Sequence, residues 1–386
     1  MSGPLAGVLV ADFTRLLAGP HAAMMLADMG ADVVKVEQPG GDDARTWGPP
    51  FVGDGSSVYF QSANRNKRSV ALDLKADEGR EAATELAARA GILLHNFRPG
   101  VAETFGLGYA DLSAANPGLV YCAISGFGPD AGPGALGNDF LLQAVGGLLS
   151  VTGPTDGPWV KVGFPVVDIL TGCYAAIGVL GAWTHRVVTG RGQLVEVDLM
   201  SSLLASLANQ AGNHLNAALK PRALGTEHPS IAPYASYATQ DREVAVAVAS
   251  DRQFDGLARA LGRPELAADP RFARNADRVA HRDALRAELE SALVERPAAE
   301  WLPVLTAAGV PAGIAHTVPE AFAYARERGL SPEVWLEGAG GERIGSVAAP
   351  FRLAGTPVEY RRAAPGVGEH TAEVLRELGI PTAGAE

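Results

Sequence analysis

The sequence is poor in several features that mark whole classes of protein. It has two cysteines, Cys122 and Cys173, in 386 residues, too few for a disulfide framework and not spaced as a C-x-x-C or zinc pair. Basic side chains number 32 against 43 acidic ones, and the formal net charge of -11 disfavours a general nucleic-acid binder. We therefore expect an intracellular, cytoplasmic protein with no nucleic-acid partner.

Several well-known catalytic and nucleotide-binding motifs are also missing. The sequence contains no P-loop, no G-x-S-x-G and no H-E-x-x-H, and its eight histidines are scattered. Residues 126–131 (GFGPDA) formally match a dinucleotide fingerprint, but Pro129 and Pro133 prevent the helix that would hold a pyrophosphate. We predict no metal and no nucleotide redox cofactor, and we interpret residues 126–137 as a loop at a strand end, near a ligand.

Neither a secretory signal nor a membrane span is expected. No Lys or Arg precedes the short apolar run at the N-terminus, MSGPLAGVLVADF. Residues 163–183 are long and apolar enough to resemble a span, but they open with a proline, contain Asp168 and several glycines, and lack flanking basic anchors. We expect this segment to be a buried helix.

What the sequence does contain is an alternation typical of an α/β fold. Apolar residues make up 47% of the chain, enough to bury a sizeable core. The order of the elements predicts a parallel sheet with crossover helices. Strands are predicted at 8–13, 32–37, 69–74, 92–95, 119–124 and 194–199, with helices at 22–29 and 77–90 and one that continues from the last strand through 216.

The character of the sequence changes after about residue 216. Residues 220–237 contain several prolines and no periodicity, so we interpret them as an interdomain crossing. A smaller α/β unit is predicted beyond them, with a strand at 243–249 and helices near 254–261, 282–293 and 299–308. A last helix is predicted at 371–378, ended by Gly379.

Asp168 is the most informative ionisable residue. It follows Pro165 by three positions, which places its carboxylate in the first turn of the apolar helix. The helix dipole is expected to keep it ionised and available as a nucleophile. A helix cap is the alternative role, but the apolar flanks favour a functional acid, because a carboxylate placed there costs free energy without a use or a partner.

Ordered blocks of sequence resemble a known family, and they extend over nearly the whole chain. They are FTRLLAGPHAAMMLADMGADVVKVEQPGGDDAR, NRNKRSVALDLK, NFRPG, GFGPDAGPG with NDFLLQAVGGL, KVGFPVVDILTG, TGRGQLVEVDLM, EHPSIAPY, DRQF and GEHT. Together they resemble the family III CoA-transferases, the relatives of formyl-CoA transferase and carnitine-CoA transferase.

The resemblance implies an interlocked homodimer. Each chain would have a large, doubly wound, Rossmann-like α/β domain and a smaller α/β domain. On this basis we assign residues 1–215 to the large CoA-binding domain, 216–329 to the small domain with its linkers, and 330–386 to a C-terminal return to the large domain.

The resemblance also implies a reaction. The family's aspartate nucleophile falls on Asp168, which would attack an acyl-CoA thioester to give a mixed anhydride and then an aspartyl-CoA thioester, from which an acceptor carboxylate takes the CoA. Backbone N–H groups at the start of its helix are expected to stabilise the oxyanions. Asp139 stands where similar enzymes have an acidic residue near the nucleophile. It would orient the site or, alternatively, cap the helix that begins there.

Coenzyme A contacts carry over only in part. The positions that contact CoA in similar proteins fall on Ala18, Leu72, Lys75, Asn96, Phe97 and Arg98. The basic run 65–68 would supply charge to the CoA phosphates or, alternatively, form a solvated loop. Leu17, Thr104 and Leu136 replace polar or basic residues of the formyl-CoA transferases, so the resemblance does not extend to formyl-CoA and oxalate specificity.

Two alternative functions stay open. The related 2-methylacyl-CoA racemases have Gly-His-Asp where this chain has Gly137-Asn138-Asp139, and an asparagine cannot take up a proton. The second alternative is a catalytically silent protein that has the same fold and binds acyl-CoA without reacting with it. The sequence favours an enzyme that transfers CoA from an acyl-CoA to a carboxylic acid, with a small dicarboxylate such as succinate as donor or acceptor.

Overall fold

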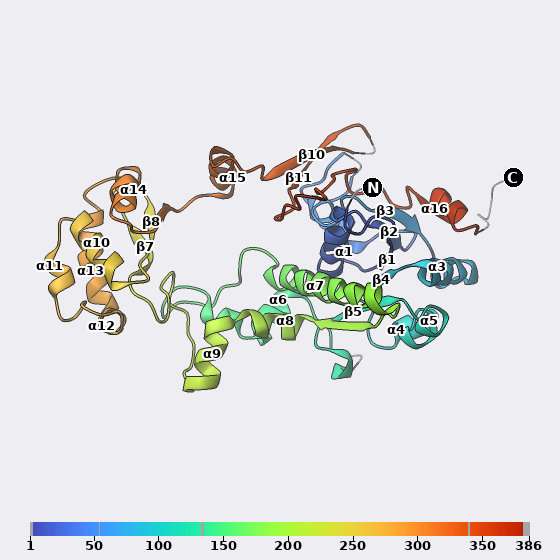
Figure 1. Cartoon of the computed structure of the whole chain (residues 1–386), viewed down its shortest axis with the longest axis horizontal. Helices are drawn as coiled ribbons and strands as arrows, with labels where there is room; N and C mark the ends of the chain where they lie inside the picture. Colours follow the sequence, from blue (N-terminus) through green and yellow to red (C-terminus); the bar gives the residue numbers. More distant parts are fainter. Residues whose placement is uncertain (1–2, 54, 133–134, 339, 381–386) are drawn as a thin grey trace. The chain divides into compact units, whose positions relative to one another are not determined.

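The computed structural model describes residues 3–53, 55–132, 135–338 and 340–380 (Figure 1). The chain divides into two compact units. The large unit comprises Met1–Leu148, Val162–Leu219 and Ser331–Glu386, and the small unit comprises Leu149–Lys161 and Lys220–Leu330. Residues 149–161, which we had included in the predicted large domain, therefore belong with the small unit.

The large unit is built on a six-stranded sheet in which every neighbouring pair is parallel. In sheet order the strands are β3 (Arg68–Ala71), β2 (Asp32–Glu37), β1 (Leu9–Phe13), β4 (Ile92–His95), β5 (Val120–Ser125) and β6 (Leu194–Asp198). The order reverses between β1 and β4, which makes the sheet doubly wound and creates a switch point where open α/β sheets bind ligands. The predicted parallel sheet is confirmed.

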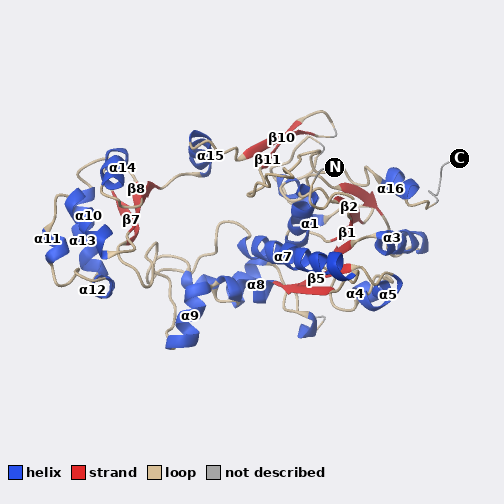
Figure 2. Cartoon of the chain, in the orientation of Figure 1, coloured by secondary structure: helices blue, strands red, loops and turns tan. Residues whose placement is uncertain are grey.

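Helices cover both faces of this sheet, which explains why its strands read as continuous apolar runs. One core lies under α1 (Ala18–Asp28), α7 (Val166–Thr189) and α8 (Leu199–Ser206). The other lies under α3 (Asp77–Arg89), α4 (Val101–Thr104), α5 (Tyr109–Ala115) and α16 (Thr371–Glu377). Because α16 packs into the second core, the C-terminal segment is part of the large unit. Figure 2 colours these helices blue and the strands red.

Helices α1 and α7 approach each other closely. A Cβ atom at Gly172 of α7 would lie 2.7 Å from the carbonyl oxygen of Ala18 in α1, so only glycine fits there. Helix α7 is long and apolar enough to span a bilayer by length and composition alone. In the large unit its buried side chains belong to the core against α1. This contact brings the start of α7 next to the start of α1.

The large unit contains fully buried ion pairs. Lys35 on β2 pairs with Asp42 at 2.8 Å, and Lys67 pairs with Asp12 at 2.9 Å, with all four side chains at 0% exposure. Next to Lys67, Arg65 bonds to Asp28 at 2.6 Å and Arg68 to Asp32 at 2.5 Å. The basic run 65–68 is therefore neither a phosphate site nor a solvated loop, and both interpretations of it were wrong. Arg65 and Lys67 neutralise buried carboxylates, and Arg68 pairs with carboxylates that are partly exposed.

The small unit has its own core and an antiparallel three-stranded sheet. The strands are β7 (Tyr234–Ala238), β8 (Glu243–Ala247) and β9 (Ala312–Ile314). The helices are α10 (Asp251–Ala260), α11 (Glu265–Ala268), α12 (Asn275–Ala280), α13 (Arg282–Leu293), α14 (Ala298–Ala307) and α15 (Val318–Glu327). Strand β7 begins inside the stretch we had predicted as an irregular crossing, because its partner β8 supplies a ladder that the local sequence does not reveal.

The remaining elements of the large unit are short, apart from α9. They are the helices α2 (Val58–Gln61), α6 (Asp139–Val145) and α9 (Ala208–Ala217), the 3₁₀ helices η1 (Asp43–Thr46) and η2 (Pro129–Ala131), and the hairpin of β10 (Glu333–Glu337) and β11 (Arg343–Val347). A third 3₁₀ helix, η3 (Leu148–Val151), lies where the chain leaves the large unit.

Candidate active site

A cavity of about 700 Å³ opens at the carboxyl ends of the central strands. Its walls come from the segments that follow β1, β4 and β5 and from the starts of α6 and α7. It therefore lies at the switch point of the sheet, and its volume suits a small organic ligand. Both Asp139 and Asp168 line it.

Asp168 lies in the first turn of α7, as the sequence predicted, and the helix begins at Val166. Its side chain is half-buried. Burial, followed by the negative charge of Asp139, raises the pKa of Asp168 from 3.8 to about 7. The helix dipole was expected to keep Asp168 ionised, but desolvation and a like charge outweigh the dipole, so the carboxyl is only partly ionised near pH 7.

Asp139 caps the helix that carries Asp168. Its Oδ1 accepts hydrogen bonds from the backbone N–H of Val167 at 2.8 Å and of Asp168 at 3.4 Å. Helix α6 itself is capped by Asn138, whose Oδ1 accepts from the N–H of Leu141. Asp139 thus caps α7 rather than its own helix. The N–H groups at 167 and 168, which we expected to stabilise oxyanions, are already engaged.

Gln143 fixes the orientation of Asp139. Its side chain is fully buried, donates from Nε2 to Oδ2 of Asp139 at 2.6 Å, and accepts at Oε1 from the N–H of Val162 at 2.9 Å. Sequence reasoning missed this residue, although it follows Asp139 by four positions, the spacing at which helical side chains meet.

Two aromatic side chains that we had not predicted also line the cavity. The rings of Trp47 and Tyr59 lie 5.2 Å apart. Burial, with the charges of Asp168 and Asp139, holds the pKa of Tyr59 well above its usual value. Tyr59 consequently stays a neutral phenol and keeps a hydrogen-bond donor beside the two acids.

The predicted CoA contacts fall into two groups. Ala18, Asn96, Phe97 and Arg98 line the cavity that holds Asp168. Leu72 and Lys75 do not line it. Leu72 is buried in the core beside α3, and Lys75 is exposed beyond the end of β3. All six come from the carboxyl edge of the parallel sheet, where successive strand ends meet.

The side-chain amide of Asn96 is bonded to the backbone of the protein. Its Oδ1 accepts from the backbone N–H of Arg15 at 2.9 Å, and its Nδ2 donates to the carbonyl of Arg15 at 2.8 Å. The amide therefore joins the segments that follow β1 and β4 across the switch point.

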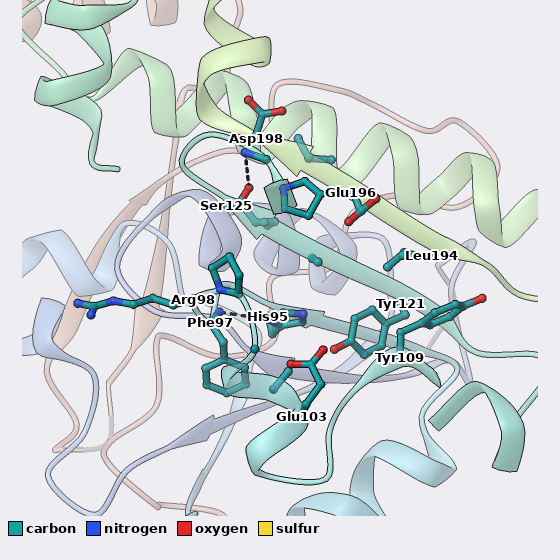
Figure 3. A pocket seen from close by; sticks show the side chains of 18 residues that line it. His95, Phe97, Arg98, Glu103, Tyr109, Tyr121, Ser125, Leu194, Glu196 and Asp198 are labelled. Atoms are coloured by element: carbon teal, nitrogen blue, oxygen red, sulfur yellow. Dashed lines mark hydrogen bonds between the residues drawn. The ribbon is translucent and has the colours of Figure 1, made fainter. Parts of the chain in front are cut away.

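A smaller cavity of about 210 Å³ adjoins this region, and Phe97 and Arg98 line both cavities. Figure 3 shows the ring of His95 between Phe97 and Tyr121, with centroid distances of 5.3 and 5.1 Å. Burial lowers the pKa of His95 to about 4, so the imidazole is neutral at pH 7. The neutral ring stacks against Phe97 and offers no positive charge to a substrate.

Among the described residues, no group of three or more His, Cys, Asp or Glu side chains is arranged to hold a metal ion. Within the part of the chain that the structure describes, the ionisable side chains that line the large cavity are two carboxylates, the Tyr59 phenol and the arginines at 15 and 98.

Fold and site together define a doubly wound α/β protein with a pair of carboxylates at the switch point of its sheet. The chain belongs to CoA-transferase family III, whose model matches residues 5–371. It is 40% identical to a succinate–glutarate CoA-transferase of Agrobacterium fabrum, covering 97% of this chain and 96% of that protein. It is 36% identical to the human succinyl-CoA:glutarate CoA-transferase, covering 97% and 86%. A crystal structure of a CaiB/BaiF family protein from Brucella suis superimposes with a TM-score of 0.86 at 38% identity, covering 98% and 100%.

The chain is therefore an enzyme of CoA transfer, with acyl-CoA as a substrate, and the resemblance seen in the sequence is confirmed.

Proposed function

We propose that this enzyme moves CoA from an acyl-CoA donor to a carboxylic acid acceptor through covalent intermediates on Asp168. The observation that supports this most is the placement of a carboxylate with a pKa of about 7 in the cavity at the switch point. A carboxylate of raised pKa is more basic than a free one. It is therefore a stronger nucleophile while still largely ionised in mildly alkaline solution.

The proposed reaction has four balanced steps. The Asp168 carboxylate attacks the thioester carbonyl, forming a mixed anhydride and releasing the CoA thiolate. The thiolate then attacks the Asp168 carbonyl, forming the aspartyl-CoA thioester and releasing the donor acid as its carboxylate. The acceptor carboxylate attacks this thioester, giving a second anhydride and free thiolate. The thiolate finally attacks the acceptor carbonyl, giving the new acyl-CoA and restoring Asp168.

These steps consume no proton and no nucleotide. Overall, one acyl-CoA thioester is exchanged for another of similar energy, and the two anhydrides, which lie higher in energy than a thioester, form only transiently. Asp139 acts as a positioning residue in this scheme, since it holds the N-terminus of α7 and raises the pKa of Asp168. We propose that Ala18, Asn96, Phe97 and Arg98 form the CoA-proximal wall. Leu72 and Lys75 would lie further along the same edge of the sheet.

The names of the relatives suggest the substrates. Succinate and glutarate, which appear in those names, are both small dicarboxylic acids. We propose that this enzyme likewise uses a small dicarboxylate as donor or acceptor.

CoA exchange in heavy water tests the proposal against both alternatives. The enzyme is incubated in D₂O with succinyl-CoA and ¹³C-labelled glutarate, and the products are analysed by mass spectrometry. Labelled glutaryl-CoA without deuterium at the α-carbon is expected. A parallel incubation with a 2-methylacyl-CoA tests the racemase, which would be indicated by deuterium uptake without transfer. Bound acyl-CoA with neither change would indicate a silent binder. Either outcome contradicts the proposal. Asn138 favours transfer, because its side chain caps α6 and cannot carry a proton.

The charge of Asp139 is expected to contribute to the pH dependence, in addition to the larger effect of burial on the pKa of Asp168. Because Asp168 must be ionised to attack, kcat/KM should rise with pH through about 7 and then level off. Asp139→Asn removes the like charge but keeps an oxygen to cap α7, so the midpoint of this limb should move to lower pH by about one unit. A pH–rate profile measures it. An unmoved midpoint would show that Asp139 does not act on Asp168 electrostatically.

We propose that the enzyme works as an interlocked homodimer. In support, α7 leaves large apolar side chains uncovered, with Ile177 64%, Val187 70% and Val188 79% exposed. Such a surface is typical of an interface. Light scattering is expected to give twice the mass of the chain, and Ile177→Glu to shift the protein toward monomer. A monomeric wild-type protein at micromolar concentration would contradict the proposal.

A further inference from the structure

Two cations line the cavity that holds Asp168, counting only described residues. They are Arg15, after β1, and Arg98, after β4. Arg98 falls on a CoA-contact position in the family resemblance, which leaves Arg15 without an assigned role.

The backbone of Arg15 is held firmly on two sides. The Asn96 side chain bonds to both its N–H and its carbonyl, at 2.9 and 2.8 Å. The next residue, Leu16, has a φ of +69°, a left-handed conformation that costs a residue with a Cβ free energy. Both carboxylate oxygens of Asp42 accept from the Leu16 N–H at 3.2 Å and help to hold this conformation. The base of the Arg15 side chain is thus preorganised.

The guanidinium of Arg15 is far less constrained than its backbone. The whole Arg15 side chain is 51% exposed, and a carboxylate oxygen of Asp43 lies 3.7 Å from its Nη1, with the Asp43 side chain 57% exposed. A pair of this length and exposure contributes little free energy, so a ligand carboxylate can compete for the cation. The side chain is fixed at its base and available at its tip.

We propose that Arg15 is the specificity-determining residue for acids that carry a second carboxylate. Its guanidinium would bind the distal carboxylate of the substrate while the proximal one reacts at Asp168. The inference rests on the proposed function and extends it to a particular side chain.

Charge in the cavity explains why such a cation is needed. Asp139 and Asp168 both repel a substrate that keeps one carboxylate unreacted. The planar fork of an arginine can bind a carboxylate with two parallel hydrogen bonds, which an ammonium group cannot reproduce. A monocarboxylic acid has no distal charge to compensate and gains nothing from Arg15.

The test compares glutarate with its monomethyl ester, which has the same chain length and one carboxylate. The acceptor preference, defined as the ratio of kcat/KM for glutarate to that for the ester, is measured with succinyl-CoA as donor. Arg15→Gln is expected to lower the preference by about 10- to 100-fold, the range for losing a hydrogen bond between charged groups. Arg15→Lys should lower it less, because the charge remains and the fork is lost.

Two control variants separate the inference from other effects. Arg98→Gln is expected to lower kcat/KM for both acceptors equally, because its role is assigned to CoA. Arg89→Gln, on the exposed face of α3 in a pair with Glu85, should change neither. An Arg15→Gln variant that loses activity with both acceptors alike, or keeps the wild-type preference, overturns the inference while the proposed function stands. Wild-type enzyme that transfers CoA to neither acid overturns both.

Discussion

Asp168→Asn is expected to abolish CoA transfer, lowering kcat by about four orders of magnitude or more. An amide cannot form the anhydride, and removal of a covalent nucleophile has effects of this size in other enzymes. Steady-state assays with succinyl-CoA and glutarate measure the loss. Calorimetric titration with CoA should show affinity within about tenfold of the wild type, because the variant keeps the cavity walls.

The same substitution is expected to stabilise the protein in alkaline solution. The folded-state pKa of Asp168 is about 7 against 3.8 for an unperturbed carboxyl, so ionisation favours the unfolded chain. This ionisation lowers the free energy of unfolding. The loss is absent near pH 3, grows as the pH rises, and reaches its full value, on the order of 4 kcal/mol, above pH 7.

Thermal unfolding at two pH values measures this gain in stability. The Tm of Asp168→Asn should exceed that of the wild type at pH 8 and match it at pH 4. Glu85→Gln, an exposed carboxylate-to-amide change on α3, is the matched control and should leave both values unaltered. Equal Tm values for wild type and Asp168→Asn at pH 8 would mean that the carboxylate is not under electrostatic strain.

Lys35→Met is expected to destabilise the large unit by about 3–5 kcal/mol. It leaves Asp42 as an uncompensated charge at a site where both side chains are fully buried. Asp42 also bonds to the N–H of Leu16, and Lys35 to the carbonyl of Thr14, so the segment that lines the cavity should loosen as well. Urea unfolding measures the free energy, and the assay above measures the accompanying loss of kcat/KM.

A control variant that breaks an exposed ion pair shows how much of the loss comes from burial of the Lys35–Asp42 pair. Arg89→Gln breaks an exposed pair on α3 and should cost no more than about 0.5 kcal/mol. Lys35→Met with a loss below 1 kcal/mol would show that the buried pair is not what holds the segment after β1.

The sequence predicted the parts of this enzyme that depend on local pattern. The parallel strands were found from their apolar runs, and the position of Asp168 from the proline before an apolar helix. Both features depend on the pattern within about ten neighbouring residues, so they can be predicted from a single sequence.

The features that were missed or misread depend on contacts between distant segments. The cations at 65–68 looked free in sequence, yet Arg65 bonds to Asp28 and to Ser346, which lies 281 residues away. Asp139 was predicted to orient the site or, alternatively, to cap its own helix, but it caps a helix that begins 27 residues later. The pKa of Asp168 is raised by burial and then by the charge of Asp139, and neither can be seen in a sequence.

Chemical trapping of the intermediate tests the central proposal most directly. The enzyme is mixed with succinyl-CoA and hydroxylamine, digested, and analysed by peptide mass spectrometry. An activated aspartyl carbonyl reacts with hydroxylamine to give a stable hydroxamate, and the modification is expected on Asp168 alone, dependent on the acyl-CoA. A hydroxamate on another carboxylate, or an unmodified chain under conditions of rapid turnover, would contradict covalent catalysis by Asp168.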